Sequence, residues 1–189
     1  MQILPTAIPD IRILVPEVFG DPRGYFMESW NEEKYKQAGI RCSWVQDNES
    51  RSSYGVLRGL HYQAGPYAQA KLVRVICGKV LDVAVDLRKG SPTFGKYVSV
   101  ELSGENKYQL FIPRGFAHGF AVLSESAVFA YKCDNIYMPE YERGIAFDDA
   151  ELGIDWRLAP EQIRLSARDQ HHPVFAEAEL FEYQIRKES

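Results

Sequence analysis

The sequence has few of the features that mark secreted or membrane proteins. It contains only three cysteines, Cys42, Cys77 and Cys133, which form neither an even disulfide framework nor a C-x-x-C pair. No run of 18 apolar residues is present, so we expect no membrane span. The first residues, Met1 to Pro5, lack the basic and then apolar pattern of a signal peptide. Reduced thiols in a cytoplasmic protein are the simplest interpretation.

The chain also lacks an excess of basic residues. Its formal net charge of −4 argues against a nucleic-acid-binding surface. An anionic small molecule would still bind, provided that a local group of cations meets it. Histidine is scarce as well, with four residues in all, so each histidine carries more weight in the search for a site.

Internal repeats, low-complexity segments and linkers are absent too. The 46% hydrophobic and 25% charged residues are typical of a globular protein, and 189 residues suffice for one sizeable core. We therefore expect a single domain over residues 1–189.

The middle of the chain has the pattern of short strands separated by turns. β-Branched and aromatic runs alternate with Gly, Pro and Ser between about residues 40 and 135, which predicts an antiparallel sandwich or barrel. The predicted strands are Lys71–Cys77, Val80–Leu87, Tyr97–Leu102, Gln109–Ile112, Phe120–Leu123 and Val128–Cys133. In the second, Asp82, Ala84 and Asp86 should face one side and Val83, Val85 and Leu87 the other.

Helices are few in this pattern. Ser29–Gly39 has a capping residue, early acidic residues and a final glycine, and it is predicted as a helix. Pro160–Ile163 and part of Ala176–Lys187 are weaker candidates.

The segment Val56–Gln63 draws attention because it combines an apolar strand pattern with Arg58 and His61. Removing both groups from water costs several kcal/mol unless each finds a partner. An anionic ligand and a carboxylate would supply these partners, so the segment is a candidate site. Three residues apart, the two side chains should face opposite sides of a regular strand. They can serve one cavity only if the strand bulges, and Gly59 is the natural place.

Similar polar interruptions occur along most of the chain. In order they are D-x-R-G-x-F-x-E from Asp21, Q-D-N from Gln46, L-R-G-L-H-x-Q from Leu57, K-L-V-R from Lys71, D-V-A-V-D-L-R-x-x-S-P-T-F-G from Asp82, G-F-A-H-G-F from Gly115 and L-S-x-(K/R)-D from Leu165. With these seven motifs, the chain from Phe19 to about Pro173 resembles the dTDP-4-dehydrorhamnose 3,5-epimerases of the cupin superfamily.

The resemblance implies a mainly β cupin jelly-roll (double-stranded β-helix) sandwich with a few short peripheral helices. It also implies the epimerisation, without a cofactor, of dTDP-4-dehydro-6-deoxy-D-glucose at C3 and C5 to dTDP-4-dehydro-L-rhamnose, in dTDP-L-rhamnose biosynthesis. The expected partners are the dTDP-4-keto-6-deoxy sugar and a second copy of the chain, with no nucleic acid and no membrane.

Catalytic roles follow from the same resemblance. His61 matches the general base, Asp169 the carboxylate that orients it, Tyr131 the acid on the opposite sugar face, and Lys71 the cation near the C4 oxygen. Tyr137 matches an aromatic that stacks on thymine. The other substrate-binding positions are Arg23, Phe26, Glu28, Gln46, Asn48, Arg58, Gln63, His118, Glu142 and Arg168; at Arg168 many relatives have lysine.

The chemistry explains these residue types. A ketone at C4 acidifies the hydrogens on C3 and C5, because each carbanion delocalises into an enolate. A histidine near neutral pKa removes such a proton, and a neighbouring carboxylate fixes its tautomer. Inversion then needs an acid on the other face, and Tyr131 suits it if its pKa is lowered or if it passes a proton only briefly. No G-x-G-x-x-G motif accompanies these residues.

Other interpretations stay open at this point. The first alternative function is a C3-only or C5-only epimerase of a related dTDP-4-keto-deoxysugar pathway. A metal-dependent cupin enzyme and a non-catalytic sugar-nucleotide binder come after it. Each site residue also has a purely structural alternative. His118 would hydrogen-bond the glycine-rich turn predicted within Pro113–Phe120, and Tyr131 would be a core aromatic. Asp169 would cap a helix, and Arg168 and Glu142 would be charges that face solvent. Asp82 and Asp86 are expected to be structural, with Asp82 an alternative cavity residue.

Two further expectations concern metals and assembly. His171 and His172 point in opposite directions on an extended chain, and no second ligand follows His61 closely, so we predict no metal. The resemblance implies a homodimer that extends one sheet into its partner, with the Ile11–Val15 run as a candidate exchanged edge strand and Arg23 or its neighbours serving the partner's site.

Overall fold

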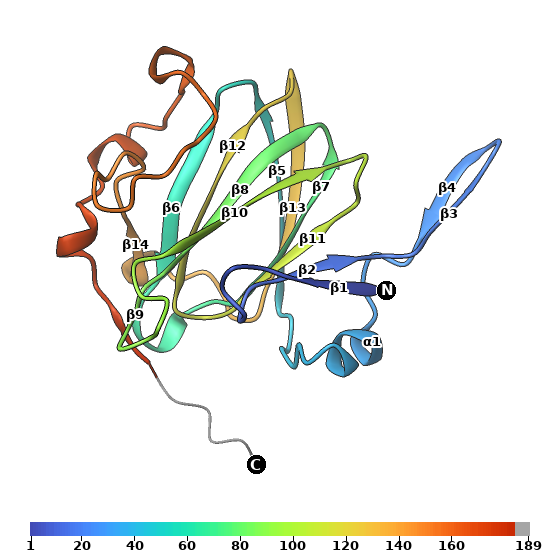
Figure 1. Ribbon diagram of the computed structural model, residues 1–189, viewed down its shortest axis with the longest axis horizontal. Coiled ribbons are helices and arrows are strands. Elements are labelled where there is room, and N and C mark those ends of the chain that lie inside the picture. The colour runs from blue at the N-terminus through green and yellow to red at the C-terminus, as the bar shows by residue number, and fades with distance from the viewer. Residues whose placement is uncertain (184–189) are drawn as a thin grey trace.

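Two antiparallel sheets dominate the computed structural model, which describes residues 1–183 (Figure 1). The six-stranded sheet has the order β1-β2-β11-β7-β13-β5 and the five-stranded sheet the order β10-β8-β12-β6-β14. The strands of the first are β1 (Gln2–Pro5), β2 (Arg12–Val15), β11 (Gln109–Ile112), β7 (Lys71–Cys77), β13 (Ser126–Cys133) and β5 (Gln46–Ser53). Those of the second are β10 (Tyr97–Ser103), β8 (Lys79–Asp86), β12 (Phe116–Val122), β6 (Leu57–Gln63) and β14 (Glu142–Gly144). The predicted mainly β sandwich is confirmed.

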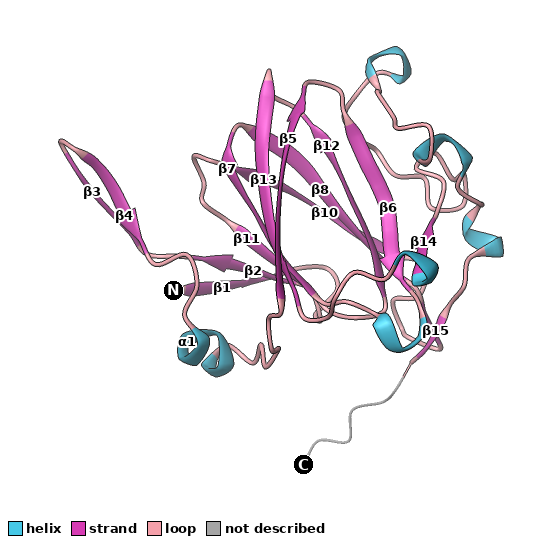
Figure 2. Cartoon of the chain, turned by 180° about the vertical axis from the view of Figure 1, so that it is seen from behind, coloured by secondary structure: helices cyan, strands magenta, loops and turns pink. Residues whose placement is uncertain are grey.

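Helices are short and lie at the periphery, as the view from behind shows (Figure 2). They are the α-helix α1 (Glu32–Gln37) and the 3-10 turns η1 (Gly65–Tyr67), η2 (Pro139–Tyr141), η3 (Pro160–Gln162), η4 (Asp169–His171) and η5 (Phe175–Glu177). Two small pairings complete the described chain: the hairpin β3 (Val18–Asp21) with β4 (Gly24–Met27), and β9 (Arg88–Lys89) with β15 (Phe181–Glu182).

Strand β8 shows how the core is divided. Ala84 belongs to the apolar cluster that also holds Val73 and Phe129 of the six-stranded sheet, whereas Val83 and Val85 belong to a second cluster. That second cluster includes Leu152, Trp156 and Phe175, so the C-terminal part of the chain covers the other face of the five-stranded sheet. The predicted alternation of β8 is correct, and both faces are buried because each has its own cover.

Helix α1 is shorter than the predicted Ser29–Gly39. Asn31 caps it, since the Asn31 side chain accepts a hydrogen bond from the backbone N–H of Lys34. Ser29 lies outside the helix because its carbonyl oxygen accepts hydrogen bonds from the side chains of Gln109 (2.8 Å) and Tyr35 (3.3 Å). Tertiary contacts therefore move the helix start by several residues.

Of the two helices predicted in the C-terminal part, one is shortened to a 3-10 turn and the described part of the other is not an α-helix. Pro160–Ile163 forms only the 3-10 turn η3, and in place of a helix from Ala176 the chain has η5 and then strand β15. The backbone N–H of Phe181 donates to the Leu87 carbonyl (3.1 Å), which holds the chain extended along β9. The remainder of the predicted helix, residues 184–187, lies outside the described residues.

Strand β12 begins at Phe116, four residues before its predicted start. Phe116 already pairs with Asp86 of β8, so the turn ends at Gly115 and His118 lies within a strand. Glycine at position 119 fits this strand because a Cβ there would lie 2.8 Å from the Arg58 carbonyl oxygen. The glycine permits close strand approach rather than a turn.

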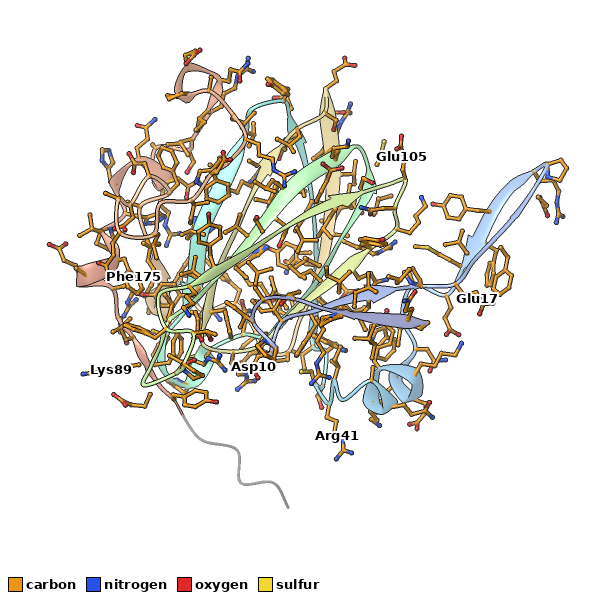
Figure 3. All side chains as sticks on the ribbon, in the orientation of Figure 1. Asp10, Glu17, Arg41, Lys89, Glu105 and Phe175 are labelled. Carbon is orange, nitrogen blue, oxygen red and sulfur yellow. The ribbon has the colours of Figure 1, made fainter. Side chains whose placement is uncertain are left out.

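The hairpin β3–β4 projects away from the two sheets (Figure 1), and its side chains extend into solvent (Figure 3). Phe19 and Phe26 are 57% and 70% exposed there. Strand β2, by contrast, is paired on both sides, with β1 and β11 of the same chain. The expectation that Ile11–Val15 forms an edge strand is therefore wrong. Within residues 1–183, no helix has the length and apolarity needed to cross a membrane.

Candidate active site

A bulge in β6 brings Arg58 and His61 to the same face. In the ladder with β12, His61 pairs with His118 and Arg58 with Phe120, so three steps along β6 match two along β12. His118 and Phe120 are two residues apart and share a face, and residues paired across strands share a face too. The extra residue lies at Gly59–Leu60, with φ of +145° at Gly59. The predicted irregularity at Gly59 is confirmed.

A cavity of about 300 Å³ opens beside this segment. His61 on β6 of the five-stranded sheet lies on one wall, whereas Lys71 on β7 and Tyr131 on β13 come from the six-stranded sheet. The full lining is Gln46, Asn48, His61, Tyr62, Gln63, Gln69, Lys71, Tyr131, Cys133, Tyr137 and Glu142. The groups predicted as base and acid thus approach one space from opposite sheets.

His61 and Asp169 form a hydrogen-bonded pair. His61 Nε2 lies 2.5 Å from Asp169 Oδ1, and the Ser166 hydroxyl donates to Asp169 Oδ2 at 2.9 Å. Burial would raise the pKa of Asp169, but the bond from His61 and the donors Ser166 and His172 hold it below its usual value. The ionised carboxylate accepts the Nε2 proton of His61, so Nδ1 is the nitrogen left to act as a base.

Tyr131 and Lys71 lie together on the opposite wall. The Lys71 Nζ atom is 5.8 Å from the centre of the Tyr131 ring. Burial lowers the pKa of Lys71, and the neighbouring acidic groups Cys133, Asp82 and Glu142 oppose this shift. Burial raises the pKa of Tyr131, so the phenol keeps its proton. A lowered pKa was one of the two ways in which Tyr131 could serve as the acid; the other, a brief transfer of its proton, is the one that fits this direction.

His118 is buried and bonded to Asp82, with 2.9 Å between His118 Nε2 and Asp82 Oδ2. Burial raises the pKa of Asp82 and lowers that of His118, so the pair favours its uncharged form. Asp82 Oδ1 is buried without a hydrogen-bond partner among the described residues. Asp82 faces the interior next to Lys71 and His118 and is not a surface group of the sheet.

Amide side chains hold the loop that carries Tyr137. Gln63 donates to the carbonyls of Tyr67 (2.7 Å) and Ile136 (3.0 Å) and accepts from the N–H of Met138 (2.6 Å). Gln46 accepts from the N–H of Tyr137 at 2.9 Å. Gln63 therefore shapes the cavity wall, since both of its amide hydrogens are engaged by backbone.

Glu142 gathers two predicted binding residues at the rim. Arg168 Nη1 donates to Glu142 Oε2 at 2.6 Å, and the Tyr137 hydroxyl donates to the same oxygen. Arg58 donates from Nε to Ser52 Oγ at 3.2 Å, and its charge acts on Tyr131. Asn48, paired with Tyr131 in the ladder, donates to Cys133 Sγ at 3.8 Å.

Seven predicted residues do not line this cavity. Four of them lie next to residues that do, namely Arg58, His118, Arg168 and Asp169, whereas the other three lie on or beside the hairpin. Arg23 lies at the tip of the hairpin with 90% of its side chain exposed and pairs with Asp21. Phe26 lies on the same hairpin, and Glu28 pairs with Lys34 at 2.8 Å. The three arginines predicted as substrate-binding positions, Arg23, Arg58 and Arg168, are therefore not gathered at one site within one chain.

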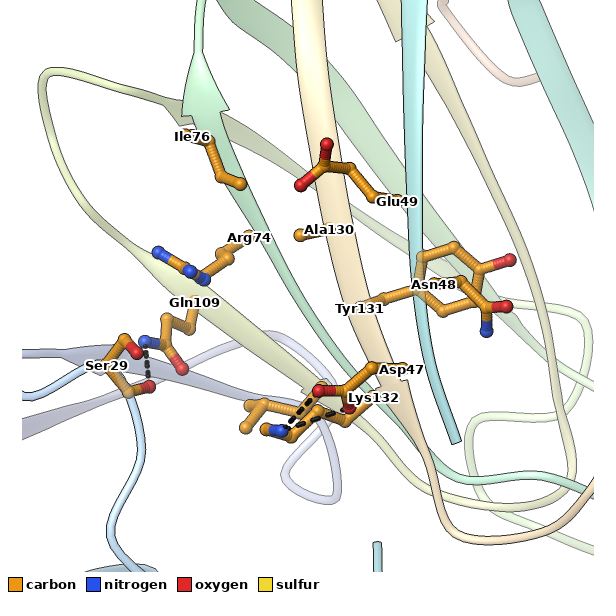
Figure 4. Close-up of a pocket in the computed structure, with 11 residues that line it drawn as sticks. Ser29, Asp47, Asn48, Glu49, Arg74, Ile76, Gln109, Ala130, Tyr131 and Lys132 are labelled. Carbon is orange, nitrogen blue, oxygen red and sulfur yellow. Dashed lines mark hydrogen bonds and ion pairs between the residues drawn. The ribbon is translucent and has the colours of Figure 1, made fainter. Parts of the chain in front are cut away.

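A second hollow, of about 320 Å³, lies over the six-stranded sheet (Figure 4). Arg74, Gln109 and Lys132 line it, and Lys132 pairs with Asp47. The Tyr131 ring lies on the far side of β13 from Arg74 and Gln109 (Figure 4). No histidine is among the described residues that line this hollow.

His172 is the main residue that the sequence did not reveal. Its Nε2 atom lies 3.2 Å from Asp169 Oδ1, and together with His61 these donor atoms lie within 4.8 Å of one another. His61 and Asp169 are closer than two ligands of one zinc ion, which stand about 3.3 Å apart in a tetrahedral site. The arrangement favours hydrogen bonding over metal ligation, and the absence of a metal stays a prediction. Cys133, also not singled out, lines the cavity.

Comparisons with known proteins identify the family of the chain. Residues 5–177 match the family model described as dTDP-4-dehydrorhamnose 3,5-epimerase. The chain is 53% identical over 182 residues to the protein of that name from Shigella flexneri, covering 96% of this chain and 99% of that protein. A relative of the same name from Pseudomonas aeruginosa is 54% identical, with the same coverage.

Among solved structures, dTDP-6-deoxy-D-glucose-3,5-epimerase RmlC from Legionella pneumophila, in complex with dTDP-4-keto-L-rhamnose, superposes with a TM-score of 0.94. It is 50% identical, covering 97% of this chain and 99% of that chain. The predicted cupin jelly-roll is therefore confirmed.

Proposed function

Because the chain belongs to the dTDP-4-dehydrorhamnose 3,5-epimerase family, we propose that it converts dTDP-4-dehydro-6-deoxy-D-glucose to dTDP-4-dehydro-L-rhamnose by inverting C3 and C5. One observation carries the proposal: His61 and Tyr131 line one cavity from opposite sheets. A sugar ring between them meets a base on one face and an acid on the other, which is what inversion requires.

Each inversion proceeds by two proton transfers. His61 Nδ1 takes the proton from carbon, the C–H electron pair moves into the C4 carbonyl as an enolate, and Asp169 stabilises the imidazolium. The Lys71 ammonium group stabilises the enolate oxygen; one such donor is worth about 100- to 1,000-fold in rate. Tyr131 then donates its phenolic proton to the opposite face of the carbon. Solvent afterwards returns a proton to Tyr131 and removes one from His61.

The nucleotide is held at the rim in this proposal. Arg58 and Arg168 supply charge-assisted bonds to phosphate oxygens, for which Arg168 exchanges Glu142 for the diphosphate. Tyr137, 46% exposed, offers its ring to thymine. Gln46 and Asn48 shape the wall near Tyr131, and the buried His118 lies across from His61 in the same sheet. The reaction needs no redox step, and we propose no cofactor and no metal.

The protein is proposed to be a single-domain, cytoplasmic homodimer. A second copy explains the hairpin β3–β4, whose Phe19 and Phe26 are left exposed by residues 1–183 of their own chain. Arg23, Phe26 and Glu28 would then complete the partner's cavity. Reduced thiols, the simplest interpretation of three cysteines without a C-x-x-C pair, suit the cytoplasm.

The reaction is tested by NMR of dTDP-4-keto-6-deoxyglucose with the protein in D2O. The proposal expects deuterium at both C3 and C5, and no exchange with His61→Ala. Label at one carbon alone would indicate a mono-epimerase instead. Tight dTDP binding without exchange would indicate a binder, and chelator-sensitive activity with stoichiometric metal would indicate a metal-dependent cupin.

A further inference from the structure

A second imidazole shares the carboxylate of the proposed base. His172 follows the 3-10 turn η4, and its Nε2 atom lies 3.2 Å from the same Asp169 Oδ1 that bonds His61. An ionised carboxylate only accepts hydrogen bonds, so each imidazole donates its Nε2–H to this oxygen. Since Ser166 occupies Oδ2, three donors fix the orientation of Asp169.

The fold makes room for this ring. A Cβ on Gly144 would lie 2.3 to 2.4 Å from three atoms of the His172 ring, so the imidazole packs directly against the glycine backbone. Gly144 pairs with His61 across β14 and β6. The two rings meet edge to face, with centres 5.4 Å apart and planes at 79°. Only 8% of the His172 side chain is exposed. Its neighbour His171 is exposed to solvent.

Asp169 is the carboxylate that both imidazoles contact, and other charged groups lie nearby. The hollow beside His172 is also lined by Glu142, Arg143, Arg168, His171, Glu177 and Glu179. Among these groups Arg168 pairs with Glu142 and Arg143 with Glu179. Burial and the charge of His61 lower the pKa of His172, although Asp169 opposes them, so the neutral imidazole of His172 is favoured as the hydrogen-bond donor to Asp169.

We propose that His172 is a positioning residue: by donating to Asp169 Oδ1 and filling the space over Gly144, it holds Asp169 and the His61 ring in the orientation needed for proton abstraction. The proposal rests on the function proposed above. A misplacement of the base by about 1 Å costs up to about 100-fold in rate, so such a support has a measurable effect.

Three variants test this role. His172→Leu fills the space without a donor, His172→Gln keeps a donor that does not titrate, and His171→Gln is the control at the exposed neighbour. We expect His172→Leu to lower kcat about tenfold with KM within about twofold of wild type. In this variant the acidic limb of the pH profile of kcat/KM should move to higher pH. Asp169 Oδ1 then accepts a hydrogen bond from His61 alone and stabilises protonated His61 more strongly. His172→Gln should recover most of kcat and the original limb, and His171→Gln should match wild type.

Two results would overturn the proposal: wild-type kcat and pH profile in His172→Leu, or an equal loss in His172→Gln and His172→Leu. Titration of His61 by 15N NMR of the ligand-free protein separates this proposal from the proposed reaction. If the wild-type protein does not epimerise, the reaction is wrong, yet His172→Leu should still change the His61 titration. An unchanged titration in that variant contradicts the positioning role itself.

Discussion

At the residue scale, partners distant in the chain decide what a side chain does. The sequence indicated that Arg58 and His61 need partners, and the family resemblance supplied Asp169, 108 residues from His61. The role of His172 is not visible in the sequence, because two adjacent histidines on an extended chain point in opposite directions and neither shows a partner. The structure uses one of them, and the signal lay in Gly144, whose missing side chain admits the ring.

Substitution of Asp86 tests how much a buried, hydrogen-bonded carboxylate contributes to stability. Asp86 accepts hydrogen bonds from Arg88, Ser91 and Thr93, and Arg88 also bonds Asp10. We expect Asp86→Asn to lower the free energy of unfolding by about 3 kcal/mol at pH 7, because Arg88 loses its buried partner. Urea unfolding followed by circular dichroism measures it.

The same variant has a defined pH dependence. Burial raises the pKa of Asp86, but the bonds from Arg88 and Thr93 outweigh it and the net shift is downward. The stabilisation is therefore present above the unfolded-state pKa of about 3.9 and is lost as the pH falls through the folded-state value. The difference in the free energy of unfolding between wild type and Asp86→Asn should become smaller below about pH 4. A difference that stays constant, or an equal loss in the exposed control Asp21→Asn, contradicts this account.

At the scale of elements, strands were predictable where burial sets a simple pattern. Lys71–Cys77 and Gln109–Ile112 match β7 and β11 at both ends. Two boundaries were not predictable. The contact of Ser29 with Gln109 keeps Ser29 out of the helix that starts at Glu32, and pairing with β8 gives β12 its early start. The bulge in β6 was predictable, since the chemistry demanded that two residues three apart share a face.

Gly59→Ala tests that bulge. A Cβ at Gly59 would lie 2.5 Å from the Gly119 Cα atom, and its φ of +145° disfavours a side chain. We expect a loss of about 3 kcal/mol in unfolding free energy and a lower kcat, because β6 must move away from β12. Gly90→Ala is the control: its φ is +87° but the nearest atom is 3.9 Å away, so about 1 kcal/mol is expected. Equal losses in both variants would mean that the close strand approach has no special importance.

At the scale of the whole molecule, one chain leaves its proposed site incomplete. Both sheets contribute to the cavity, but Arg23, Phe26 and Glu28 lie on or beside a hairpin that projects away from the sheets (Figure 1). The motif D-x-R-G-x-F-x-E pointed to binding residues, yet no sequence pattern says which subunit's site they serve. Only the three-dimensional arrangement separates these residues from the cavity of their own chain.

Mixing two inactive variants tests this arrangement. If Arg23 serves the partner, Arg23→Ala and His61→Ala subunits together form a heterodimer with one intact site. Random exchange of subunits should then restore about a quarter of wild-type activity, measured by coupled assay after refolding the mixture. Sedimentation should give about twice the 21.6 kDa of one chain. A monomer, or a mixture without recovered activity, contradicts the shared site.

The central claim is that His61 and Tyr131 act on opposite faces of one sugar, and the stereochemistry of exchange in Tyr131→Phe tests it most directly. The variant keeps the base but lacks the phenolic proton. NMR in D2O should therefore show deuterium entering C3 and C5 with retention of configuration, while the epimerised product forms at least about 100-fold more slowly than in wild type. Inversion at the wild-type rate in Tyr131→Phe would contradict the account.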